Sequence, residues 1–137
     1  MISGQVVRDA MVREPLALEA DRSAREAGEA LARPDVRVVF VVSDRRLVGA
    51  VTRKTLVREI VAAGRDPETT LLGEIAERPN HTIACEMPLD QAFTELEELD
   101  LERVPVIDGE RLVGVLSRSV VQRRLAEDEP PPDQDVE

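Results

Sequence analysis

Four consecutive residues, Thr52-Arg53-Lys54-Thr55, combine hydroxyls and cations in a way that could bind an anion. A hydroxyl that ends a strand and opens a helix caps the first backbone N–H groups, which lack partners inside the helix. Those N–H groups and the helix dipole attract anions. Cations in the first turn oppose the dipole, so a phosphate would explain Arg53 and Lys54. The alternative is that both are solvated surface residues and Thr52 is only a cap.

A second pair with reactive side chains is His81 and Cys85, four residues apart. They would supply only two of the four ligands of a structural zinc ion. On a strand they would lie on the same side, about two pleats apart, and most such residues serve packing or the surface. The sequence has no glycine-rich phosphate loop of the Walker or dinucleotide type. We therefore expect no metal site, no catalytic residue, no required cofactor and no enzymatic activity.

Composition excludes several classes of partner. The formal net charge is −10, but six acids lie in residues 127–137, and the rest carries 22 acids against 18 bases. A nearly balanced body with an acidic tail does not suit DNA or an anionic membrane. Phe40 and Phe93 are the only aromatic residues, which disfavours binding of single-stranded nucleic acid by stacking.

The chain has one cysteine, which excludes an intrachain disulfide. It shows neither a signal peptide nor an apolar run of about 20 residues. These features predict a soluble, cytoplasmic protein.

The sequence that forms the elements around these residues occurs twice. The phrase "RLVGAVTRK" at 46–54 returns as "RLVGVLSRS" at 111–119, an offset of 65 residues. The same offset aligns both halves without a gap, which indicates an internal duplication. The identical pairs are Arg13/Arg78, Ala27/Ala92, Leu31/Leu96, Asp35/Asp100, Val39/Val104, Val41/Val106, Arg46/Arg111, Leu47/Leu112, Val48/Val113, Gly49/Gly114, Arg53/Arg118 and Arg58/Arg123.

Each copy begins with an extended segment and a helix. The extended segments are 16–19 and 81–85. In the first copy Ser23-Ala24-Arg25-Glu26 has the form of a capping box. In the second copy Pro88 suits the first helical turn, and an apolar stripe at helical spacing follows it.

A hairpin and a second helix complete each copy. The runs 38–43 and 104–108 predict buried strands. Asp108-Gly109 is a hairpin-turn signal, and Asp44-Arg45 takes that place in the first copy. The return strands are 47–51 and 112–116, and their central glycines, Gly49 and Gly114, indicate a close approach of backbone. Thr52 and Ser117 then cap the last helices, and Gly64 marks a helix end.

The resulting unit is β-α-β-β-α, with a parallel first pair of strands and an antiparallel hairpin. We predict an α/β (α+β) fold of two such repeats related by a pseudo-twofold axis and packed as one module. The repeats span residues 6–63 and 71–126, with a linker at 64–70 and a disordered, acidic, Pro-rich tail at 127–137. The segment 9–14 predicts a short helix, from which Val7 and Met11 either pack on the body or contact a partner.

The segments "VRDAMVREPLAL", "VVFVVSDRRLVGAVTRKTL" and "VPVIDGERLVGVLSRSVV" resemble a tandem pair of cystathionine-β-synthase (CBS) domains, a Bateman module, over roughly residues 6–126. The resemblance implies a regulatory module that binds an adenosine-containing ligand (AMP, ADP, ATP or S-adenosylmethionine) between the repeats. It also implies dimers formed through helices and a conformational signal to a partner.

The resemblance also implies where the ligand would bind. In the family, an Asp three residues after the Ser or Thr grips the ribose. Here Thr55 and Val120 stand at those positions, so ribose binding is weakened in the first copy and doubtful in the second. Phe40 either offers its ring to an adenine or fills the core. The candidate ligand-binding residues are Leu16, Ala17, Leu18, Val39, Phe40, Thr52, Arg53, Lys54, Thr55, Thr82, Ile83, Val104, Pro105, Ser117, Arg118 and Val120.

Two functions remain open at this point. The first is a stand-alone CBS-pair regulator that binds an adenine nucleotide or S-adenosylmethionine and signals to an unknown protein effector. The second is a ligand-free homodimeric scaffold with degenerate nucleotide sites. The basic turn at Arg53-Lys54 favours the regulator, and the loss of the ribose Asp favours the scaffold. Neither DNA nor a membrane is an expected partner.

Overall fold

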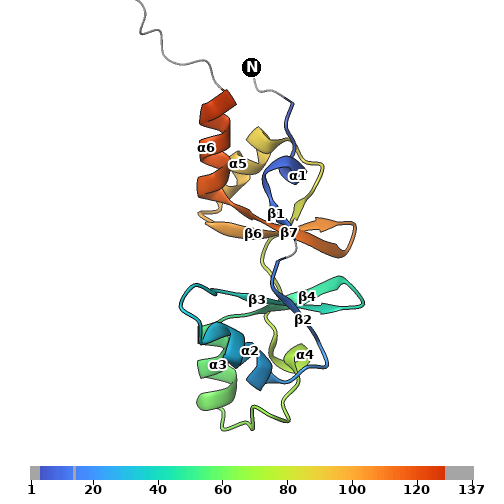
Figure 1. The fold of residues 1–137 in the computed structure, drawn as a ribbon, viewed down its shortest axis with the longest axis vertical. Helices are drawn as coiled ribbons and strands as arrows, with labels where there is room; N and C mark the ends of the chain where they lie inside the picture. Colours follow the sequence, from blue (N-terminus) through green and yellow to red (C-terminus); the bar gives the residue numbers. More distant parts are fainter. Residues whose placement is uncertain (1–3, 14, 129–137) are drawn as a thin grey trace, which may run out of the picture. The chain divides into compact units, whose positions relative to one another are not determined.

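A computed structural model describes residues 4–13 and 15–128 of the 137-residue chain (Figure 1). The described residues form two compact units. Among the described residues, unit 1 draws on 4–13, 81–108 and 113–128, and unit 2 on 15–80 and 109–112. The fold is of the mixed α+β class, as predicted.

Unit 2 contains most of the first sequence repeat. Its elements are β2 (Ala17–Glu19), α2 (Ala24–Leu31), β3 (Val39–Ser43), β4 (Arg46–Val51), α3 (Arg53–Leu56), the π-helical segment η1 (Val57–Val61) and α4 (Leu72–Ile75). β2 pairs with β3 in parallel, and β3 pairs with β4 antiparallel, as the β-α-β-β-α pattern predicts. In Figure 1, α2, α3 and α4 lie on the same side of these strands, so unit 2 has two layers.

Unit 1 contains most of the second repeat. Its elements are α1 (Val7–Ala10), β1 (Val12–Arg13), β5 (Ile83–Ala84), α5 (Leu89–Glu98), β6 (Arg103–Asp108), β7 (Arg111–Ser117) and α6 (Arg118–Asp128). β5 and β6 are parallel, and β6 lies beside β7. α6 continues to Asp128, two residues into the predicted tail, and residues 129–137 of that tail lie outside the described residues.

The two repeats exchange their first segments. The start of the first repeat packs in unit 1, where the N–H groups of Val7 and Arg8 donate to the carbonyls of Met87 and Cys85 at 2.9 Å each. β1 pairs with β7 through Val12 and Val115. The equivalent start of the second repeat, α4, packs in unit 2, because the N–H groups of Leu72 and Gly73 donate to the carbonyls of Arg22 and Ala20 at 2.9 Å.

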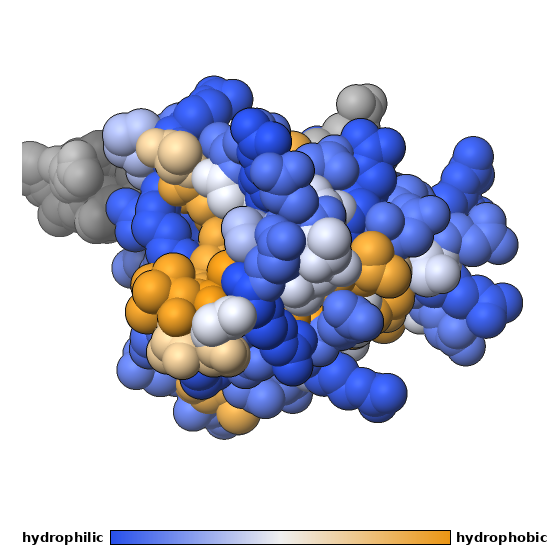
Figure 2. All heavy atoms as spheres, turned by 90° about the horizontal axis from the view of Figure 1, so that it is seen from below, coloured by the Kyte–Doolittle hydropathy of each residue, from blue (hydrophilic) through white to orange (hydrophobic). Residues whose placement is uncertain are grey.

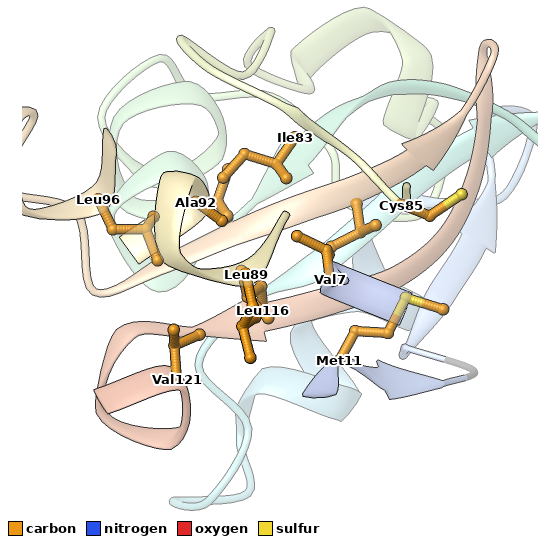
Figure 3. Packing of buried hydrophobic residues seen from close by; sticks show 11 residues of the cluster. Val7, Met11, Ile83, Cys85, Leu89, Ala92, Leu96, Leu116 and Val121 are labelled. Atoms are coloured by element: carbon orange, nitrogen blue, oxygen red, sulfur yellow. The ribbon is translucent and has the colours of Figure 1, made fainter. Parts of the chain in front are cut away.

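Each unit has its own aliphatic core. In unit 1, Leu89, Leu96, Leu116 and Val121 are fully buried, and Val7 from α1 and Met11 join them (Figure 3). In unit 2, Leu31, Val39, Val41, Val51 and Leu72 fill the same role. Val7 and Met11 therefore pack on the body, the first of the two predicted alternatives.

Both mid-strand glycines mark close backbone approaches, as predicted. A Cβ on Gly49 would lie 2.6 Å from the carbonyl oxygen of Glu77, and a Cβ on Gly114 would lie 2.8 Å from that of Val12. Real Cβ atoms do not come this close to backbone, so only glycine fits. The two contacts are equivalent, since each joins a return strand to the segment exchanged from the other repeat.

Local sequence signals predicted most helix ends and hairpin turns correctly. Ser23 and Glu26 form the predicted capping box, and Gly64 has a φ of 73° just after η1. Asp44 and Arg45 turn the first hairpin with φ values of 54° and 71°. In the second hairpin the residue with positive φ is Gly109, at 68°.

Three local predictions were wrong in detail. The helix predicted at 9–14 is α1, which ends at Ala10, because Val12 and Arg13 are drawn into pairing with β7. Glu14 lies outside the described residues. Pro88 is the residue before α5, with ψ 139°, and is not within its first turn. The last helix of the first repeat becomes π-helical, with Ala62 N–H donating to the carbonyl of Val57 at 2.8 Å.

Candidate ligand site

Thr52 and Thr55 cap the start of α3 reciprocally. The Thr55 N–H donates to Thr52 Oγ1 at 3.3 Å, and the Thr52 N–H donates to Thr55 Oγ1 at 3.1 Å. The two hydroxyl oxygens lie 3.1 Å apart. This arrangement is a capping box with Thr in place of the usual Glu or Gln, and it confirms that Thr52 is the N-cap residue.

The Thr55 hydroxyl also reaches a carboxylate that the sequence did not single out. It donates to Glu77 Oε2 at 2.6 Å, and the Arg58 guanidinium lies 2.7 Å from the same oxygen. Glu77 is held in place through its backbone, which exchanges two hydrogen bonds of 2.9 Å with Ala50. The donated hydroxyl lowers the pKa of the Glu77 carboxyl below its ordinary value, and Arg58 and Lys54 lower it further. Glu77 is therefore ionised at neutral pH.

The arginines of the two capping turns point to the ends of the preceding helices. The Arg53 guanidinium donates to the carbonyl of Arg33 at 2.7 Å, just beyond α2. Its repeat partner Arg118 donates to the carbonyl of Leu96 in α5 at 3.5 Å. A cation at the carboxyl end of a helix is favourable for the helix dipole. Arg53 thus has a structural partner, although both Arg53 and Lys54 are exposed.

Unit 1 lacks the polar cluster of unit 2. Ser117 caps α6, with the Val120 N–H donating to Ser117 Oγ at 3.5 Å, so its predicted capping role is confirmed. Val120 stands where unit 2 has Thr55 and offers no hydroxyl. The counterpart of Glu77 is Val12, which is 58% exposed. At the start of α6, Ser117 Oγ lies 3.5 Å from Glu102 Oε2 and Arg118 Nε lies 3.7 Å from Glu102 Oε1, so unit 1 has a looser polar group without a counterpart of the Thr55–Glu77 pair.

The remaining candidate residues divide between the two faces of their strands. Four of them pack with the helix-side cores, namely Leu18, Val39, Ile83 and Val104. Because side chains alternate along a strand, the adjacent candidates Ala17, Phe40 and Pro105 face away from those helices. Ala17 and Phe40 are opposite each other in the β2–β3 ladder, and Phe40 is buried. Pro105 is buried, Thr82 is partly buried, and Leu16 is exposed.

His81 and Cys85 have separate partners. His81 Nε2 lies 2.9 Å from Glu95 Oε1 on α5. Cys85 is buried, and the Arg8 guanidinium donates to its Sγ at 2.9 Å. Across residues 4–13 and 15–128, no group of three or more His, Cys, Asp or Glu side chains could hold a metal ion.

An apolar groove that the sequence analysis missed runs along unit 2 between α2 and the α3–η1 helix. It has a volume of about 420 Å³, and Gly28, Leu56, Ile60 and Val61 are among the residues that line it. Val57 and Val61, one helical turn apart on η1, are 58% and 73% exposed. Figure 2, which views the molecule from below, shows apolar side chains gathered into a patch among hydrophilic ones.

The repeated β-α-β-β-α units correspond to a known family. The family model described as "CBS domain" matches residues 7–62 and, a second time, residues 72–127. The chain belongs to the CBS domain family. The two matches confirm the tandem repeat and the resemblance to a Bateman module.

Several CBS proteins are similar to this chain. Hypoxic response protein 1 of Mycobacterium tuberculosis (strain ATCC 25618 / H37Rv) is 34% identical over 84 residues, which are 61% of this chain and 59% of the relative. The match thus spans less than two thirds of that relative. CBS domain-containing protein YhcV of Bacillus subtilis (strain 168) is 23% identical over 111 residues, 81% of this chain and 79% of the relative.

Solved CBS structures share the fold. A crystal structure of hypoxic response protein I with two coordinated zinc ions has a TM-score of 0.75 and 27% identity, covering 88% of this chain and 99% of the other. CBSX2 in complex with AMP has a TM-score of 0.73 and 23% identity, covering 90% and 98%. Among the described residues of the present CBS pair, no helix is long and apolar enough to cross a membrane.

Proposed function

We propose that this CBS pair is a regulatory module that senses an adenosine-containing ligand and signals to a partner protein by a conformational change. AMP, ADP, ATP and S-adenosylmethionine are the candidate ligands. The observation that carries the proposal is the polar cluster at the start of α3. There the Glu77 carboxylate accepts a hydrogen bond from Thr55, and the positive charge of Lys54 helps to lower its pKa. An acceptor and a cation at one place match the hydroxyls and the phosphate of a nucleotide. The proposal assigns binding, and no catalysis, to the chain.

Family membership supports the ligand class, since one structural relative was solved with AMP. A ligand would shift the conformation only by binding one state more tightly than another. The residues proposed for contact in unit 2 are Thr52, Arg53, Lys54 and Glu77 at the start of α3, together with the buried Phe40. In unit 1, Thr82, Pro105, Ser117 and Arg118 are proposed for a second, less polar site.

A thermal-shift panel tests the ligand class directly. The purified protein is heated with AMP, ADP, ATP, S-adenosylmethionine, GTP or inorganic phosphate. A ligand at about 100 times its dissociation constant stabilises the native state by roughly 2.7 kcal/mol, which is a shift of several degrees for a chain of this size. A shift confined to adenine compounds supports the sensor. No shift with any compound refutes it.

A second function, a homodimeric scaffold, is favoured by the apolar groove of unit 2. Gly28 leaves the groove open, whereas unit 1 has Phe93 at the equivalent position, packed against its core. Val61 lines the groove, and Val57 is exposed one helical turn earlier. The equivalent residues of α6 are Ala126 and Gln122. A second copy of the chain could bury this apolar surface, and Arg25 and Glu29 beside it supply both signs of charge for pairing about a twofold axis.

Sedimentation velocity of the wild type, Val61→Asp and Ala126→Asp tests the scaffold. Ala126→Asp is the matched control, because it places the same charge at the equivalent position of unit 1. The expected result is a dimer for the wild type and the control, and a monomer for Val61→Asp. A monomeric wild type, or a dimer that survives Val61→Asp, contradicts association through this groove.

A further inference from the structure

The hydroxyl of Thr55 has no capacity left for a ligand. A threonine hydroxyl has one proton to donate and two lone pairs to accept with. Thr55 gives its proton to Glu77 at 2.6 Å and accepts the Thr52 N–H at 3.1 Å. With its proton used in this way, it accepts from the Thr52 hydroxyl, 3.1 Å away. The side chain is also fully buried.

The carboxylate of Glu77 has the capacity that Thr55 lacks. Its partners, the Thr55 hydroxyl and the Arg58 guanidinium, both contact Oε2. Among the described residues, the contacts of this carboxylate stop there, which leaves Oε1 available as an acceptor. The side chain is 48% exposed, so Oε1 is within reach of a bound molecule. An ionised carboxylate accepts only, and its hydrogen bonds are stronger than those of a neutral acceptor.

The surrounding charges select the kind of donor. Arg58 pairs with Glu77 directly, and Lys54 adds a second positive charge nearby. With its charge already balanced, Glu77 has little need of a cationic ligand, and a neutral donor such as a sugar hydroxyl suits it better. The backbone pairing of Glu77 with Ala50 holds the carboxylate in this position before any ligand arrives.

We propose that Glu77, rather than Thr55, is the residue that recognises the vicinal hydroxyls of a nucleoside in unit 2. This inference rests on the proposed sensor function and names the specificity-determining group of the same site. Thr55 and Arg58 are positioning residues, which orient the carboxylate through Oε2 and leave Oε1 to the ligand.

Isothermal titration calorimetry with AMP, 2′-deoxy-AMP, 3′-deoxy-AMP and 2′,3′-dideoxy-AMP tests the inference on the wild type, Glu77→Gln and Glu59→Gln. Glu59→Gln is the matched control, since Glu59 also contacts Arg58, at 3.2 Å, but does not contact Thr55. The wild type and the control should bind AMP about tenfold or more tightly than the dideoxy compound. Glu77→Gln should lose most of this preference and bind the dideoxy compound as the wild type does.

Each outcome is decisive. A wild type that binds AMP and keeps its preference for AMP in Glu77→Gln overturns the role of Glu77 while the sensor stands. A wild type that binds none of the four compounds overturns this inference, whereas the sensor fails only if the thermal-shift panel shows no shift with any compound. Tighter AMP binding by Glu77→Gln shows that the carboxylate blocks the site, which also overturns the inference. If Glu77→Gln does not fold, Glu77→Asp replaces it; Asp keeps the charge but withdraws it by one methylene, and should lose the same preference.

Discussion

Units 1 and 2 share a framework but differ at equivalent positions of the apolar groove and of the polar cluster. Gly28, Val57 and Val61 of unit 2 correspond to Phe93, Gln122 and Ala126, and Thr55 and Glu77 correspond to Val120 and Val12. Gly28 and Val61 line an apolar groove in unit 2, whereas Phe93 packs against the core of unit 1. Thr55 and Glu77 build a polar cluster in unit 2.

Several positions that are identical in the two repeats lie inside the units. Leu31/Leu96, Val39/Val104, Val41/Val106 and Gly49/Gly114 are identical in both repeats, and all lie in a core or at a backbone contact. These core and backbone-contact positions are alike in both repeats, whereas the groove position Gly28/Phe93 and the cluster position Thr55/Val120 differ. The comparison supports the site proposed in unit 2, and it can be tested at equivalent residues.

The largest effect is expected from truncating the shared leucine of the first helix. Leu31 and Leu96 are 2% and 0% exposed, each in its own core. Leu31→Ala and Leu96→Ala should each lower the free energy of unfolding by about 2–5 kcal/mol, because each leaves a cavity. Urea denaturation measures the loss. A variant that loses less than about 1 kcal/mol would contradict the equivalence of the two cores.

The next largest effect is expected at the close backbone contacts. Gly49→Ala puts a methyl group 2.6 Å from the carbonyl oxygen of Glu77, and Gly114→Ala puts one 2.7 Å from Met11 Sδ and 2.8 Å from the carbonyl oxygen of Val12. We expect a loss of about 1–3 kcal/mol in each, typical of overpacking. The melting temperatures of the two variants and the wild type measure this loss. Gly73→Ala is the milder control, since its methyl group would lie 3.2 Å from the Cβ of Ala20.

A pH-dependent effect should distinguish the polar cluster from its apolar counterpart. The pKa of Glu77 is lowered in the folded chain, chiefly by the Thr55 hydroxyl. A lowered folded pKa stabilises the protein above the unfolded value of about 4.3, and this stabilisation is lost as the pH falls through the folded value.

Melting temperatures from pH 7 to pH 3 should therefore fall more for the wild type than for Glu77→Gln, with the gap closing below about pH 4. Val12→Ala in unit 1 is the control, because it removes no ionisable group. Parallel curves for the wild type and Glu77→Gln would show that the carboxylate is not stabilised by its neighbours.

The smallest effect on stability is expected from Gly28→Ala in the apolar groove. Gly28→Ala adds a methyl group at ordinary contact distance, 3.7 Å, from Leu56 Cδ1. Alanine favours a helix over glycine by up to about 1 kcal/mol, so the variant should melt slightly higher than the wild type. A lower melting temperature would indicate that Gly28 is needed for close packing at this face, as expected if the groove is already covered by a second copy of the chain.

Most of the fold could be predicted because its signals are local. The capping box at Ser23, the turn at Asp44-Arg45 and the stop at Gly64 each depend on a few neighbouring residues, and each was found where expected. The candidate site was less predictable. Thr52 was recognised as a cap, but Glu77 lies 22 residues from Thr55 and carries no motif of its own.

The sequence by itself determined the duplication, the family and the β-α-β-β-α order, since periodicity, glycines and caps act within one repeat. It also determined that Val120 cannot supply a polar group in unit 1. The tertiary structure alone decided that the first segments of the repeats are exchanged, which brings Glu77 to Thr55 and leaves Val12 exposed in unit 1. Tertiary packing also decided that Gly28 faces an open groove while Phe93 packs against a core. The reason is physical: backbone pairing with a distant strand depends on where that strand lies, and no local pattern encodes it.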